Sequence, residues 1–156
     1  MNPETPLGAF LDFVILWLVV SIFIPYLSGW AELARYYRSQ IKFDGARWRG
    51  CTCHMRWLGR YEKCVTIGAN TKGIHFSVFF PFRIGHPPLF VPWHDVSVRE
   101  GKTLAWKWTE FRFSQPAGVW MRFYGGLPDE IRRVAGTSWP GGSTKIEDIQ
   151  STRNAS

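Results

Sequence analysis

The first 34 residues contain no lysine or arginine, and the whole chain of 156 residues contains only three cysteines. Three thiols cannot build the dense disulfide framework of a small secreted domain, and they suit a reducing compartment. The chain also lacks the G-x-S-x-G, H-E-x-x-H and P-loop patterns of common catalytic and nucleotide-binding sites. We therefore expect no enzymatic activity and no cofactor.

One long apolar run is present, from Leu7 to Leu27, and Ser21 is the only polar side chain between Phe13 and Ile24. A helix of about 21 residues is about 31 Å long, which matches the hydrocarbon core of a bilayer. The run lacks the basic start and small-residue cleavage pattern of a signal peptide. We predict a transmembrane helix over residues 7–28 after a short outside amino terminus, residues 1–6. A buried core helix of a soluble domain is the alternative.

Basic residues follow this run directly, with eight lysines and arginines against two acids in residues 35–63, and the net charge of the chain is +7. Positive charge close behind a span is retained on the cytoplasmic side. The sequence therefore predicts a single-pass protein of the plasma (inner) membrane whose carboxy-terminal domain is cytoplasmic. There a basic domain faces the anionic head groups of the lipid bilayer. No nucleic-acid partner is expected, because no nucleic-acid-binding motif accompanies the charge.

Residues 29–44 have the pattern of a juxtamembrane amphipathic helix. Trp30, Leu33, Ala34 and Tyr37 recur at helical spacing, whereas the charged residues fall on other faces. Such a helix either couples the anchor rigidly to the following domain or lies at the lipid interface through its aromatic residues. Both interpretations stay open.

From about Arg47 the apolar residues recur with period two, as in half-buried strands. Residues 65–69 and 74–80 flank the turn sequence Asn70–Gly73 and predict a hairpin. Further strands are predicted at 89–91, 95–99, 104–108, 111–114 and 119–123, separated by the turn sequences GHPP, REGK and SQPAG. In LAWKWTEFRF the apolar positions shift from even to odd numbers, which predicts a bulge or tight turn at Thr109 and Glu110.

A short helix closes the predicted domain in LPDEIRRVAG, where Pro128 suits a helix start and Gly136 a helix end. The fold class is α+β and mainly antiparallel β: a transmembrane helix followed by a small barrel or sandwich over residues 45–136. Residues 137–156 are polar and rich in glycine and serine, and we expect a disordered tail there.

The stretch CVTIGANTKGIHFSVFFPFRIGHPPLFVPWHDVSV resembles the middle of pleckstrin-homology and GRAM-like domains. With SGWAELARYYR behind an apolar leader, residues 10–125 also resemble a group of small, uncharacterised bacterial membrane-anchored proteins. The resemblance implies a pleckstrin-homology/GRAM-like β domain. It also implies a lipid-binding loop between the first strands, where RWLGRYEK supplies Arg56, Arg60 and Lys63 beside Trp57. Nonspecific contact of these charges with head groups is expected rather than inositide recognition.

Two sets of side chains suggest metal chemistry. CTCH supplies Cys51, Cys53 and His54, and Cys64 follows on the next strand, but the spacing fits neither a zinc site nor haem attachment. His86 and His94 bracket the proline-rich stretch HPPLFVPWH, which is typical of a chain entering an edge strand. We interpret both sets as structural and predict no metal, with the CTCH set and Cys64 as weak candidates.

Two functions of different class follow. The β domain is expected to be a non-catalytic binding module for a protein partner or anionic lipid head groups, acting through Arg56, Arg60, Lys63 and Trp57. The alternative is an accessory or structural subunit of a larger membrane assembly.

Overall fold

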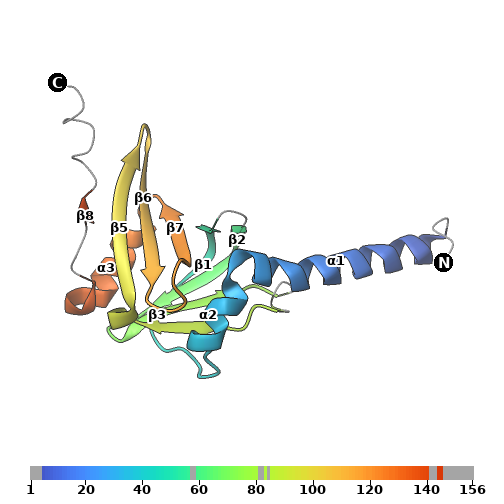
Figure 1. Cartoon of the computed structure of the whole chain (residues 1–156), viewed down its shortest axis with the longest axis horizontal. Coiled ribbons are helices and arrows are strands. Elements are labelled where there is room, and N and C mark those ends of the chain that lie inside the picture. Colours follow the sequence, from blue (N-terminus) through green and yellow to red (C-terminus); the bar gives the residue numbers. More distant parts are fainter. Residues whose placement is uncertain (1–4, 57–58, 81–82, 84, 141–143, 146–156) are drawn as a thin grey trace.

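A computed structural model describes residues 5–56, 59–80, 83, 85–140 and 144–145. Two helices come first, then an antiparallel sheet, and a third helix follows the main sheet strands (Figure 1). In chain order the helices and main strands are α1 (Pro6–Ser28), α2 (Trp30–Tyr37), β1 (Ala46–Met55), β2 (Gly59–Ala69), β3 (Gly73–Val78), β4 (Leu89–Pro92), β5 (Val96–Thr103), β6 (Trp106–Phe113), β7 (Trp120–Tyr124) and α3 (Leu127–Ala135), with a short β8 (Thr144–Lys145).

Helix α1 is long and apolar enough to cross a membrane by length and composition. The hydroxyl oxygen of Thr5 accepts a hydrogen bond from the backbone N–H of Gly8 at its start, and Gly29 ends it with a left-handed φ of 91°. The helix continues past Pro25 to Ser28. Only 12% of its most apolar window is buried, so it projects from the domain with its apolar surface exposed (Figure 1).

Helix α2 packs into the core of the β domain. Its residues Trp30 and Leu33 are fully buried and Tyr37 is nearly so. The indole N–H of Trp30 donates to the carbonyl of Pro87 at 3.0 Å, and the Tyr37 hydroxyl donates to Asp95 at 3.2 Å. Helix α2 is therefore part of the folded domain, as a rigid coupler would be.

The seven main strands form one curled antiparallel sheet, in the order β4-β3-β2-β1-β7-β6-β5, and β8 pairs in parallel with β5 (Figure 1). The predicted hairpin is confirmed: Val65 pairs with Val78 and Ala69 with Ile74. The predicted α+β class with a short carboxy-terminal helix is also confirmed, since Pro128 lies in the first turn of α3 and Gly136 caps its end.

Two expectations at the β5–β6 hairpin are wrong. Strand β5 runs through the REGK sequence to Thr103, so the turn lies at Leu104 and Ala105. Strand β6 passes Thr109 and Glu110 in regular register with both neighbours, without a bulge or turn.

The apolar positions shift along β6 because side chains from a neighbouring strand also cover part of its outer face. The guanidinium of Arg122 lies 4.4 Å from the centroid of the Trp108 ring. Glu110, only 2% exposed, accepts hydrogen bonds from Arg112 and Arg122. Burial alone would raise the pKa of Glu110, but these two arginines hold it below its ordinary value.

The folded domain extends beyond Gly136. Trp139 packs against Trp93 and Phe111, with ring centroids 5.7 and 5.8 Å apart, and Arg132 lies over its ring. Residues 137–140, predicted as the start of a disordered tail, are therefore part of the folded domain, and Thr144–Lys145 pair with β5. Most of that tail, residues 141–143 and 146–156, lies outside the described residues.

Candidate anion-binding pocket

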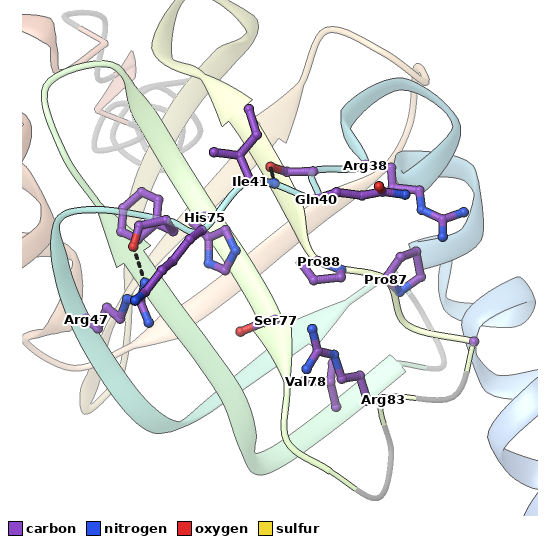
Figure 2. Close-up of a pocket in the computed structure, with 14 residues that line it drawn as sticks. Arg38, Gln40, Ile41, Arg47, His75, Ser77, Val78, Arg83, Pro87 and Pro88 are labelled. Carbon is purple, nitrogen blue, oxygen red and sulfur yellow. Dashed lines mark hydrogen bonds between the residues drawn. The ribbon is translucent and has the colours of Figure 1, made fainter.

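A pocket of about 730 Å³ lies beside the domain end of α1 (Figure 2). The segment between α2 and β1 forms one wall, β3 forms the floor, and the connection between β3 and β4 forms the other wall. Its lining residues are Arg38, Ser39, Gln40, Ile41, Lys42, Phe43, Arg47, His75, Ser77, Val78, Arg83, Gly85, Pro87 and Pro88.

Contacts with β3 and with the β3–β4 connection fix the segment between α2 and β1 in place. The backbone N–H of Ser39 donates to the carbonyl of Pro88 at 2.9 Å, which ties the end of α2 to the opposite wall. The ring of Phe43 then stacks on His75, with centroids 4.9 Å apart. Gly68 permits this packing, because a Cβ atom there would lie 2.4 Å from the Phe43 ring. The segment therefore crosses the outer face of the sheet as a fixed wall.

Four basic side chains line the pocket: Arg38, Lys42, Arg47 and Arg83. Among the described residues, the lining contains no aspartate or glutamate, and none of the four makes an ion pair. Arg47 donates to the carbonyl of Phe43, which fixes part of its guanidinium. In the view of Figure 2, Arg47 and Arg83 lie on opposite sides of His75 and Ser77. Uncompensated positive charge around a concave surface attracts an anion.

His75 is the buried polar group of this pocket. It is 9% exposed, and its Nδ1 atom has no hydrogen-bond partner among the described residues. Burial, assisted by the positive charge of Arg47, lowers the pKa of His75 to about 4. The ring is therefore neutral at pH 7, and a neutral imidazole can either donate or accept at Nδ1.

The predicted lipid-binding residues lie elsewhere. The guanidinium of Arg56 forms two hydrogen bonds of 2.9 Å with the carboxylate of Glu32 on α2. Arg60 pairs with Glu62, and both are well exposed. Lys63 is exposed at an irregularity in β2, where its φ is 51°. None of the three lines the pocket, and Trp57, predicted with them, lies outside the described residues.

All three cysteines are free thiols; Cys51 and Cys53 are buried, and Cys64 is half-buried. Burial raises the pKa of Cys51, Cys53 and Cys64, so each disfavours the thiolate that binds metals. Burial also lowers the pKa of His54, and the charges of Arg60 and Arg122 lower it further. In the described part of the chain, no group of three or more His, Cys, Asp or Glu side chains is placed to hold a metal ion.

Comparison with protein-family models finds no match to the chain, and comparison with curated protein sequences finds none either.

One feature of the sequence indicates this pocket: two polar residues within an otherwise apolar strand. His75 and Ser77 alternate with the apolar residues of β3, which places both on the outer face. Basic residues lie in the segments before β1 and after β3, but nothing local shows that these segments meet. Phe43 on His75 and Ser39 on Pro88 bring them together.

Proposed function

We propose that this chain is a single-pass protein of the plasma membrane whose cytoplasmic β domain is a non-catalytic binding module for anionic lipid head groups. Helix α1 is the anchor, and the charge behind it sets the orientation. The observation that carries the proposal is the position of the basic pocket. One of its lining residues, Gly85, packs on α1, since a Cβ atom there would lie 3.0 Å from Pro25.

Phosphate chemistry suits this lining. Guanidinium groups bind phosphate oxygens through two parallel hydrogen bonds, and Lys42 adds a mobile point charge. The cytoplasmic leaflet has a negative surface potential, and each basic side chain close to it is worth about 1 kcal/mol. A lipid phosphate would therefore be drawn to the pocket before any specific contact forms.

We also propose that the β domain is pleckstrin-homology/GRAM-like, as the sequence resemblance implies. The strand order supports this assignment: β1 to β4 form one meander, β5 to β7 form a second, and β1 pairs with β7. Helix α3 then follows the last main strand. In this proposal the head-group site is the basic pocket, and it is a different place from the loop with Arg56, Arg60 and Lys63, which the resemblance implies.

The proposal is tested by lipid titration of the full chain in a neutral detergent. Dihexanoyl phosphatidylglycerol should bind more tightly than dihexanoyl phosphatidylcholine, and calorimetry measures both affinities. The variants Arg47→Gln and Arg83→Gln should each weaken phosphatidylglycerol binding by about fivefold, because each removes about 1 kcal/mol of attraction. Raising the salt to about 1 M should weaken binding further, since the screening length then falls to about 3 Å.

Two control variants locate the site. Arg133→Gln makes the same charge change on the exposed side of α3 and should leave the affinity unchanged. Arg60→Gln combined with Lys63→Gln tests the loop implied by the resemblance. Loss of binding only in that double variant would move the site from the pocket to the loop, and equal affinity for both lipids would contradict head-group binding.

A protein partner is the second candidate, in which the chain is an accessory subunit of a membrane assembly. The tip of the β5–β6 hairpin favours it, because Leu104 is fully exposed and Trp106 is 66% exposed, and the hairpin projects from the sheet (Figure 1). Purification in mild detergent should then retain a stoichiometric partner. Leu104→Ser combined with Trp106→Ser should release that partner.

A further inference from the structure

A second exposed apolar feature lies at the start of the connection between β3 and β4. Phe79 and Phe80 follow β3 directly and are 68% and 71% exposed. The backbone N–H of Phe79 donates to the carbonyl of Cys64 at 2.8 Å, which fixes the start of the connection on the sheet. Two adjacent exposed phenylalanines are a costly surface in water unless something apolar covers them.

Gly85, towards the end of the connection, packs against the side of α1. A Cβ atom at Gly85 would lie 3.0 Å from the Pro25 ring and 3.2 Å from the carbonyl oxygen of Ser21. Pro25 has no N–H to bond that carbonyl, so Gly85 packs where the helix surface is open. Ser21 and Pro25 precede the helix end at Ser28 by seven and three residues. At 1.5 Å per residue, the contact lies about 5 to 10 Å inside the span.

The helix surface at this level is itself apolar and exposed. Phe23 is 59% exposed, Tyr26 is 64% and Leu27 is 57%. If α1 crosses the bilayer, as proposed above, the same depth of lipid surrounds these side chains and Gly85, which packs against Ser21 and Pro25. The sequence from Phe79 to Pro88 contains no acidic residue, and its single Arg83 can reach the head groups while its stem stays among apolar atoms.

We propose that Phe79 and Phe80, at the start of the β3–β4 connection, form a second membrane contact by entering the near leaflet next to the anchor. This inference depends on the proposed anchor but not on head-group binding. The bilayer is the occupant because Phe79 and Phe80 are exposed, and the connection that carries them packs against the apolar anchor at Gly85. The domain is thereby held at two points, which keeps the basic pocket at the depth of the head groups.

Spin labels at three positions of the full chain in phosphatidylcholine/phosphatidylglycerol nanodiscs test the inference. Cys64→Ala provides the parent, because Cys51 and Cys53 are buried. Single labels replace Phe80, Leu16 in the middle of α1, and Leu104 on the distal hairpin, all highly exposed. Collisions with oxygen, which enters lipid, are compared with collisions with a water-soluble nickel complex. We expect an oxygen-to-nickel ratio several-fold higher at 80 and 16 than at 104.

The other outcomes separate the two proposals. A low ratio at 80 with a high ratio at 16 would overturn the second contact and leave the anchor standing. Few collisions with either reagent at 80 would mean that protein covers the site, which also overturns it. Low ratios at both 80 and 16 would contradict the anchor itself.

Discussion

At the residue scale, His75 shows how burial and charge act on one side chain. The ring lies between Phe43 and the strand floor, is 9% exposed and stays neutral at pH 7. Because its folded pKa of about 4 lies below its unfolded value of about 6.5, the unfolded chain binds the proton more readily. The stability contributed by neutral His75 is therefore complete above about pH 6.5 and is lost as the pH falls through about 4.

We predict that His75→Phe removes this part of the acid sensitivity. In the wild-type chain, the lowered pKa of His75 decreases the free energy of unfolding by at most about 3 kcal/mol as the pH falls from 6.5 to 4. Phenylalanine keeps the stacking on Phe43 and does not titrate. Urea unfolding at several pH values, followed by tryptophan fluorescence, measures the difference. His94→Phe makes the same substitution at an exposed position and is the matched control. Equal slopes in wild type and His75→Phe would refute the assignment.

At the element scale, a buried polar chain joins the anchor to the β domain. The hydroxyl of Tyr61, 5% exposed, lies 2.7 Å from Ser28 Oγ at the end of α1 and 3.0 Å from His86 Nε2. Gly59 allows this approach, because a Cβ atom there would lie 2.8 Å from the Cβ atom of Ser28. The ion pair between Arg56 and Glu32 lies at the same junction. These contacts fix the direction in which α1 leaves the domain.

We predict that Tyr61→Phe weakens this junction. The substitution removes two buried hydrogen bonds, those that join the Tyr61 hydroxyl to Ser28 and to His86, so the free energy of unfolding should fall by about 1 to 2 kcal/mol. Hydrogen exchange should also rise at residues 28–33. Tyr36→Phe is the matched control, since Tyr36 is 58% exposed and its hydroxyl should contribute little. Unchanged stability and exchange in Tyr61→Phe would show that the chain of hydroxyls does not hold the helix.

The β6 strand shows where period-two reading fails. The alternation rule assigns every apolar residue of a strand to one buried face. Under that rule, the change from Trp106 and Trp108 to Phe111 requires a bulge or turn between them. In the structure both faces of β6 are partly covered: Phe111 and Phe113 face the core, and Arg122 lies over Trp108 on the other side. That cover comes from β7, a neighbour that the β6 sequence does not reveal.

At the scale of the whole molecule, charge should decide which way the chain crosses the membrane. We predict that green fluorescent protein fused after Ser156 is fluorescent and that alkaline phosphatase fused there is inactive, because both results require a cytoplasmic carboxy terminus. Replacing Arg35, Arg38 and Lys42 by glutamine, with three lysines added before Pro3, should shift a fraction of the chains to the opposite orientation. An active phosphatase fusion in the unaltered chain would contradict the proposed orientation.

The sequence by itself determined the apolar helix, the β2–β3 hairpin, the α+β class and the closing helix. Each of these depends on neighbours close in the chain: apolar length, period-two alternation, turn residues, and proline and glycine at helix ends. Only the tertiary structure decided the pocket, the packing of α2 in the core and the inclusion of Trp139. Arg47 and Arg83 are 36 positions apart in the sequence, and the pocket exists because Phe43 stacks on His75 and Ser39 bonds to Pro88. Such contacts join residues that are far apart in the sequence, and local sequence patterns do not show which distant segments will meet.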